Sequence, residues 1–152
     1  AGKVQTMSGT GEVTLNELVL LDAAGQQIEM VAVGQAVSLR VTITCHTQIE
    51  ELVVGYMIKD RLGQPIFGTN THHHNHKLNN VQENKNIEFH FDFQANLGPG
   101  SYSMAIALHT DDTHLAKNYE WRDNALIFTI INIDKNDFVG VAWLPPTIRC
   151  SV

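Results

Sequence analysis

The run His72-His73-His74-Asn75-His76 is the densest cluster of potentially reactive side chains in the sequence. Alternate residues of an extended segment point the same way, so the imidazoles of His72 and His74 could in principle share a metal ion. A structural zinc site, however, usually takes ligands from two separate segments with help from cysteine or acidic residues. We therefore predict no metal site here. We interpret His72 and His74 as surface groups that exchange hydrogen bonds with a hydroxylated ligand.

The other reactive residues do not form a catalytic motif. No glycine-rich run is followed by Lys and Ser or Thr, and no Gly-x-Ser-x-Gly elbow occurs. Gly9-Thr10-Gly11 is too short for a dinucleotide-binding fingerprint, so we expect no cofactor. Glycoside hydrolysis needs two carboxylates that face each other across a cleft, whereas the pairs Asp111-Asp112 and Glu50-Glu51 are adjacent. We predict that the domain is not an enzyme, with a carbohydrate-active enzyme as the minor alternative.

A second set of candidate binding residues lies in the expected loop 111–123. Tyr119 and Trp121 would project to one side of an extended segment, where their rings can pack against the C–H faces of a sugar. The alternative, equally compatible with the sequence, is that Trp121 closes one end of a hydrophobic core. Polar side chains nearby would bind the sugar hydroxyls. Our candidate carbohydrate-binding residues are Tyr119, Trp121, His72, His74, Arg61, Asp112 and His114.

Length and composition restrict the classes of protein to consider. A chain of 152 residues that is 43% hydrophobic and 17% charged fits one globular domain. No apolar stretch is long enough to span a membrane, so we expect no direct membrane insertion. A net charge of −6 opposes nucleic-acid binding. Cys45 and Cys150 make no metal motif, and we expect reduced thiols, with a disulfide as the alternative.

Alternation of apolar and polar residues with a period of two predicts antiparallel strands with one buried face. The pattern is clearest over 37–45 and 87–93. Together with turn signals rich in Gly, Pro, Asn and Asp, it predicts an all-β sandwich or small barrel. The eight predicted strands span residues 12–21, 27–33, 37–45, 51–60, 65–71, 87–93, 101–110 and 124–133.

Two of these predicted strands have outward faces that include small residues. Strand 101–110 leaves Ser103, Ala105, Ala107 and His109 outside, and strand 51–60 leaves Val53, Gly55, Met57 and Lys59 outside. If the two strands are adjacent and the sheet curves, they form a concave surface suited to an extended polymer. Otherwise they form an ordinary packed or solvated face.

The C-terminal region contains an apolar run, 138–144, that needs an apolar surface to pack against. The strand 124–133 is apolar on both faces, with Ile127, Ile131 and Ile133 on the second one. The tail covers that face either by folding back or by exchange with a second copy across the hinge 133–137. We favour a homodimer with an exchanged C-terminal strand over 138–149. We expect residues 1–10 to be a linker or disordered, and 11–152 to form a single domain.

Several motifs resemble the C-terminal domains of Wzt-type proteins, and with an opening that runs from Gly11-Glu12-Val13 through Asp22 and Gly25 the likeness covers most of the chain. These motifs are Gly55-Tyr56-Met57-Ile58-Lys59-Asp60, Gly63, Ile66-Phe67-Gly68-Thr69-Asn70-Thr71, Leu97-Gly98-Pro99-Gly100-Ser101-Tyr102 and Tyr119-Glu120-Trp121-Arg122-Asp123-Asn124-Ala125.

The resemblance implies a fold and a function. Wzt-type proteins are the nucleotide-binding subunits of ABC transporters that export O-antigen polysaccharide of lipopolysaccharide. Their C-terminal domain is an immunoglobulin-like antiparallel β-sandwich that recognises the finished glycan, often at its capped non-reducing end. This chain would then act in the cytoplasm at the inner face of the bacterial inner membrane. Its partner through the full-length protein would be the transporter's membrane subunit, and the ATPase half would lie outside this sequence. The alternative is a structural dimerisation domain of the ATPase subunit.

Overall fold

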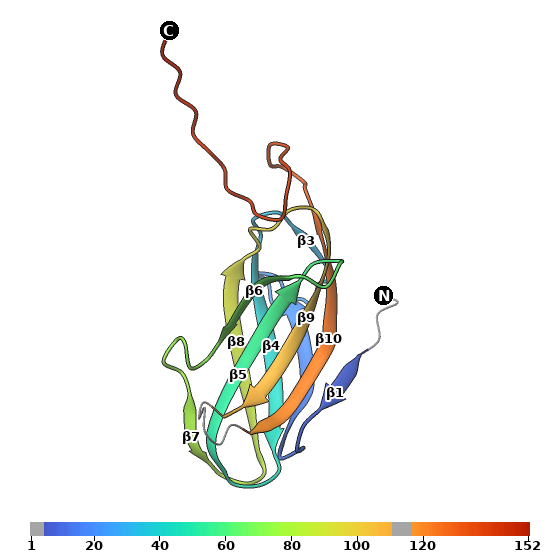
Figure 1. Cartoon of the computed structure of the whole chain (residues 1–152), viewed down its shortest axis with the longest axis vertical. Coiled ribbons are helices and arrows are strands. Elements are labelled where there is room, and N and C mark those ends of the chain that lie inside the picture. Colours follow the sequence, from blue (N-terminus) through green and yellow to red (C-terminus); the bar gives the residue numbers. More distant parts are fainter. Residues whose placement is uncertain (1–4, 111–116) are drawn as a thin grey trace.

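The structure, a computed structural model, describes residues 5–110 and 117–152, which fold into an all-β sandwich (Figure 1). No helix in these residues is long and apolar enough to cross a membrane. The strands within them are β1 (Thr6–Ser8), β2 (Val13–Leu21), β3 (Met30–Ala32), β4 (Ala36–Cys45), β5 (Ile49–Lys59), β6 (Pro65–Asn70), β7 (Leu78–Val81), β8 (Lys85–Gln94), β9 (Gly100–His109) and β10 (Asn118–Ile131).

The strands form two sheets that face each other. The larger sheet has the order β1-β10-β9-β5-β6, with β3 also paired to β10 and β7 also paired to β5. The smaller sheet has the order β2-β4-β8. All pairs are antiparallel except the short parallel pair of β3 with β10. The predicted antiparallel sandwich is confirmed.

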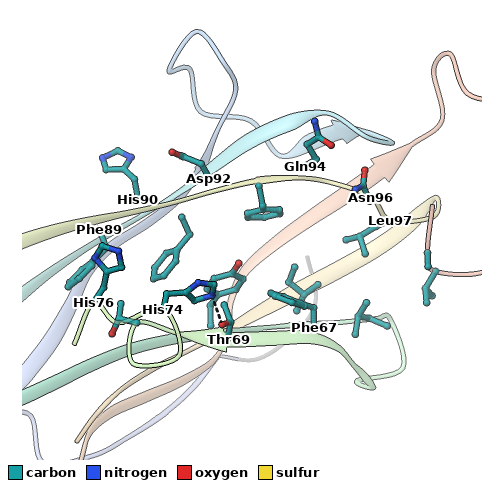
Figure 2. Close-up of a pocket in the computed structure, with 18 residues that line it drawn as sticks. Phe67, Thr69, His74, His76, Phe89, His90, Asp92, Gln94, Asn96 and Leu97 are labelled. Carbon is teal, nitrogen blue, oxygen red and sulfur yellow. Dashed lines mark hydrogen bonds between the residues drawn. The ribbon is translucent and has the colours of Figure 1, made fainter. Parts of the chain in front are cut away.

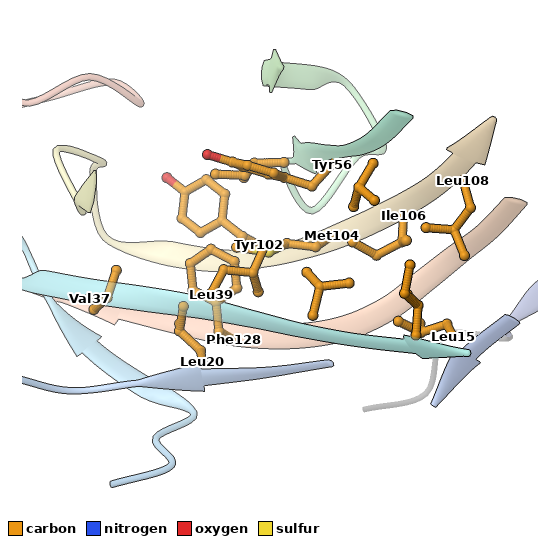
Figure 3. Close-up of a cluster of buried hydrophobic side chains, with 14 of the residues drawn as sticks. Leu15, Leu20, Val37, Leu39, Tyr56, Tyr102, Met104, Ile106, Leu108 and Phe128 are labelled. Carbon is orange, nitrogen blue, oxygen red and sulfur yellow. The ribbon is translucent and has the colours of Figure 1, made fainter. Parts of the chain in front are cut away.

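The alternating sequence pattern produces the core because each strand turns one face inward. Along β4, residues from Val37 to Cys45 alternate strictly between buried and half-buried positions. Figure 3 shows Leu39 of the smaller sheet facing Met104 and Ile106 of the larger one. Tyr102 stacks on Phe128 with ring centroids 5.6 Å apart. Burying each such large apolar side chain stabilises the fold by roughly 1.5–3 kcal/mol.

Each of the eight strands predicted from alternation overlaps an observed one, but β1, β7 and the start of β10 lie where no strand was expected. Residues 1–10, expected to be a linker or disordered, contain β1, which pairs with residues 121–123 of β10. A strand of three residues is too short to show alternation. The region 111–123, expected to be a loop, contains the start of β10 at Asn118. Register shifts between Asn118 and Glu120, and between Arg122 and Leu126, interrupt the alternation there.

The expected C-terminal strand over 138–149 is not a strand in the single chain. Only Ala142 forms a bridge, to Leu97, and beyond it the chain runs away from the sandwich (Figure 1). The tail also does not cover the second face of β10, where the adjoining Ile133 is exposed. The physical reason is that an extended segment becomes a strand only when it has a pairing partner.

Candidate functional site

A hollow of about 390 Å³ lies on the outer face of the larger sheet, across β6, β5, β9 and β10. This is the face for which the sequence left two interpretations open, a concave surface or an ordinary packed or solvated face. The hollow is lined by Gly55, Tyr56, Met57, Gly68, Thr69, Asn70, His73, Ala105, Ala107, His109 and Trp121.

The floor of the hollow follows from the register of the central strands. Gly55 of β5 lies opposite Ala107 of β9 on one side and Asn70 of β6 on the other. Because these floor residues are small, the backbone is close to the surface. A Cβ added at Gly55 would lie 3.1 Å from Cβ of Asn70, so a larger residue would crowd β6. The floor therefore lets a flat ligand approach the sheet closely.

Trp121 forms the β10 side of the hollow. It lies opposite Ala107, on the same outer face. Lys59 Nζ lies over the indole ring, 5.8 Å from its centroid. The same ammonium group is 3.2 Å from Oδ1 of Asp123 and 3.3 Å from Oδ2. The indole ring of Trp121 thus makes a cation–π contact with a lysine whose charge is balanced by a carboxylate.

The polar groups of the hollow come from β6, the turn after it and the end of β9. The amide oxygen of Asn70 accepts a hydrogen bond of 2.9 Å from the backbone N–H of His73. Nδ1 of His109 lies 2.7 Å from the carbonyl oxygen of Thr110, so this nitrogen carries the proton and donates. When the ring is neutral, its Nε2 is left as an acceptor. Aromatic, amide and imidazole groups around an uncharged floor are the chemistry that binds sugar rings and hydroxyls.

A second cavity, of about 720 Å³, opens between the edge strands β6 and β8. We call it the apolar groove, because Phe67, Phe89, Phe91 and Phe93 dominate its lining. Figure 2 shows Phe67, Thr69 and His74 on one wall and Phe89 on the other, while His90 and Asp92 point away. His74 Nε2 lies 3.0 Å from Oγ1 of Thr69, which fixes the imidazole at the groove wall. Val141 and Ala142 line one end of the groove.

Trp121 is the candidate residue that the structure brings to the hollow, whereas Tyr119 is buried. The Tyr119 hydroxyl donates a 2.9 Å hydrogen bond to the carbonyl oxygen of Glu51, and burial raises the pKa of the phenol. The two rings were expected on one side of an extended segment. The register shift between Asn118 and Glu120 instead turns Tyr119 toward the core.

The remaining candidates are dispersed. His72 is exposed in the turn after β6, and Arg61 is exposed in the turn between β5 and β6. His74 belongs to the apolar groove. Asp112 and His114 lie outside the described residues. Among the residues that are described, no group of three or more His, Cys, Asp or Glu could hold a metal ion.

Sequence reasoning did not select Asn70, His73 or His109 as binding residues. The outward position of His109 was visible in the alternation of residues 101–110. His73 could be selected only with knowledge of how the turn folds, because neighbouring histidines line different cavities. His73 lines the hollow and His74 lines the apolar groove.

Comparison with known proteins identifies similar domains. A family model described as the Wzt C-terminal domain matches residues 4–144. A crystal structure described as the C-terminal domain of Wzt matches with a TM-score of 0.85 at 17% identity, over 97% of this chain and 89% of the other. A Niemann-Pick type C2 protein from the Japanese carpenter ant matches with a TM-score of 0.54 at 7% identity, over 85% of this chain and all of the other. At these identities the structural matches show the fold alone. No curated protein matches the sequence.

Proposed function

This chain belongs to the Wzt C-terminal domain family, and from that premise we propose that it binds O-antigen polysaccharide for export by an ABC transporter. The family supports a role related to O-antigen transport and a domain without catalysis of its own. The observation that carries the finer proposal is the hollow, where Trp121, Asn70, His73 and His109 lie around a floor that includes glycine and alanine.

The dimensions of the hollow favour a short stretch of glycan. Its volume of about 390 Å³ falls within the range of small-molecule sites, which is roughly 300–1,000 Å³. A sugar ring on this floor would stack on Trp121 and exchange hydrogen bonds with Asn70, His73 and His109. A site that holds only a few sugar units suits recognition of a chain end, and we propose the capped non-reducing end. No carboxylate lines the hollow among the described residues, which argues against glycoside hydrolysis there.

In the cell, this recognition would take place in the cytoplasm at the inner face of the inner membrane. The full-length protein would contact the membrane subunit of the transporter through its ATPase half. Binding of the finished glycan by this domain would then connect chain completion to transport, with no bond made or broken in the domain.

The test is a binding titration of the full-length protein with the O-polysaccharide of its own organism and with an unrelated one. We expect saturable binding of the first only, and at least a tenfold loss in Trp121→Ala, because the stacking surface is removed. The matched control is Thr42→Ala, which changes an outward residue of the opposite sheet. Absent or equal binding of the two polysaccharides would refute recognition. Release of shorter glycan fragments during the titration would favour an enzyme.

A second proposal concerns assembly, and it rests on the apolar tail. Leu144 and Ile148 are 80% and 84% exposed, and Val152 is fully exposed at the end of the chain. Exposed apolar segments of this kind usually mark a contact with another molecule. We propose that the domain is a homodimer in which residues 144–152 of each copy enter the apolar groove of the other.

The geometry favours exchange over folding back. The backbone N–H of Gly98 donates to Val141 and that of Trp143 donates to Asn96, which fixes the start of the tail at one end of the groove. Pro145 and Pro146 then follow, each with φ fixed near −65°, so a tight reversal is disfavoured. Residues 144–152 in extended form span about 30 Å, close to the length of the ten-residue β8 at the groove's edge.

This proposal is tested by measuring the mass of the full-length protein in solution by sedimentation. We expect Ile148→Asp to convert a dimer into a monomer, because a carboxylate would enter a groove lined by phenylalanine. Thr147→Asp is the control, since successive residues of an extended tail point to opposite sides. A native monomer, or a dimer that survives Ile148→Asp, would contradict the exchange.

A further inference from the structure

The charged groups at the edge of the hollow are already paired with each other. The side chains of Lys59 and Asp123 are 18% and 28% exposed, and they form the ion pair beside Trp121. The described residues that line the hollow include no Lys, Arg, Asp or Glu. The hollow therefore combines a nearby cation with a lining that has no formal charge.

The pairing is built into the backbone of β10. Asn124 has a positive φ of 50°, at the register shift between Arg122 and Leu126. The backbone N–H of Asn124 donates a 2.9 Å hydrogen bond to Oδ1 of Asp123, which fixes the carboxylate where Lys59 reaches it. The lysine comes from the end of β5 and is placed by its register with Ser103 of β9. The position of Lys59 beside the indole therefore depends on β5, on β10 and on the register shift in β10.

This arrangement determines which ligands the hollow accepts. A carboxylate or phosphate that leaves water needs a cationic partner, and burying it without one is costly. Lys59 is not available as that partner, because its charge is balanced by Asp123. The net charge of the chain, −6, also repels anions over a longer range. Neutral sugars incur neither penalty.

We propose that the hollow takes a neutral sugar and rejects acidic ones, and that Lys59 and Asp123 are the positioning residues responsible. Lys59 supports the ring of Trp121 through its ammonium group, and Asp123 cancels the lysine's charge so that the hollow stays uncharged. This inference rests on the proposed glycan recognition and names the chemical class of the sugar.

The experiment uses two matched forms of one ligand and the full-length protein. The probe is the O-polysaccharide of the organism after reduction of any carboxylates to alcohols. Its counterpart is the same material after oxidation of primary hydroxyls to carboxylates. Binding is measured at pH 8, above the usual titration range of histidine. We expect the native protein to bind the neutral form at least tenfold more tightly than the oxidised form.

Asp123→Asn tests the charge balance, because it leaves the lysine charge uncompensated while keeping the side chain's shape. We expect the preference for the neutral form to fall by at least fivefold. Glu51→Gln is the matched control. It makes the same change in net charge at another half-buried ion pair, Lys77 with Glu51 at 3.4 Å, and we expect the preference to stay unchanged.

Lys59→Met, combined with Asp123→Asn, tests whether the ammonium group of Lys59 holds the indole ring of Trp121 in place. The double variant keeps the hollow uncharged, so we expect it to retain the preference for the neutral form. Its affinity should fall several-fold, and the fluorescence emission of Trp121 should shift as the ring loses its neighbour. Loss of the preference for the neutral form in the double variant would contradict the inference, because this variant leaves no unbalanced charge beside the hollow.

The outcomes distinguish this inference from the proposed function. If the native protein binds neither form, glycan recognition itself fails. If it binds both forms equally, or the oxidised form more tightly, recognition stands and the neutral-sugar inference fails. If Asp123→Asn and Glu51→Gln change the preference equally, the effect belongs to net charge and the assigned role of Asp123 is wrong.

Discussion

Glu120 is a carboxylate inside the sandwich, only 4% exposed. Its Oε2 accepts a 3.1 Å hydrogen bond from the backbone N–H of Leu15 and lies 3.3 Å from Arg122. Leu15 belongs to the smaller sheet and Arg122 to the larger one, so one carboxylate joins the two sheets. A register shift in β2 lies directly after Leu15. Glu120 thus satisfies a polar group of the backbone where the regular strand pairing is interrupted.

We predict that Glu120→Ala lowers the free energy of unfolding by about 3 kcal/mol, because it removes the carboxylate partner of the half-buried Arg122 guanidinium and the acceptor of the buried Leu15 N–H. Glu120→Gln keeps an acceptor oxygen and should cost less than half as much. The measurement is urea-induced unfolding. Glu88→Ala, at an exposed carboxylate beside Arg40, should change stability by less than about 1 kcal/mol. Equal losses at the two positions would contradict the bridging role.

Single residues were predictable from the sequence only where the alternation was regular. Trp121 was selected for its ring and does line the hollow. Tyr119 was selected with it, but the bulge between Asn118 and Glu120 buries the ring of Tyr119. A bulge adds one residue and reverses the face of everything after it, and the letters Asn-Tyr-Glu-Trp do not reveal which residue is extra.

At the scale of elements, the hollow is a property of the pairing of β5 with β9. Both outward faces were predicted from alternation, and their adjacency is a property of the sheet order β10-β9-β5-β6. The contribution of β6 was not predicted, because nothing in its sequence states that Asn70 lies beside Gly55. Local pattern predicts which face a residue occupies, whereas contacts between distant strands depend on the topology.

A larger side chain on the floor of the hollow should weaken glycan binding without unfolding the sheet. We predict that Ala107→Leu reduces affinity for the O-polysaccharide at least tenfold, because the added side chain occupies the space beside Trp121 where the sugar ring would stack. Ala107 is half-buried on the outer face, so the substitution should change the free energy of unfolding by less than about 1 kcal/mol. Thr42→Leu is the control on the outer face of β4. Binding is measured by calorimetric titration, and undiminished affinity in Ala107→Leu would place the glycan elsewhere.

At the scale of the whole molecule, β6 is shared by both cavities. Its outward residues Gly68 and Asn70 line the hollow, and its inward residues Phe67 and Thr69 line the apolar groove, with Thr69 reaching both. The strand pairs only with β5 among the described strands, so its other edge is open. The sequence predicted that the apolar tail covers the second face of residues 124–133. It did not predict the groove, because a cavity between two sheet edges depends on how far the sheets separate.

Stability at high pH depends on groups distributed through the whole core. Burial raises the pKa of Tyr56, Tyr102 and Tyr119, the three tyrosines of the chain, and of the Cys45 thiol. Between the unfolded and folded pKa values, the folded chain retains protons that the unfolded chain releases. The free energy of unfolding therefore falls as pH rises, by up to about 1.4 kcal/mol per pH unit for each such proton.

We predict constant stability from pH 7 to 8 and a progressive loss above about pH 9, where free thiols and then phenols begin to ionise. Guanidinium unfolding at each pH measures the loss, and phenolate absorbance shows whether the tyrosines ionise only as the chain unfolds. Tyr56→Phe should show a smaller loss than the native protein, because one of the retained protons is absent from it. Stability that stays level up to pH 11, or a Tyr56→Phe curve parallel to that of the native protein, would contradict this assignment.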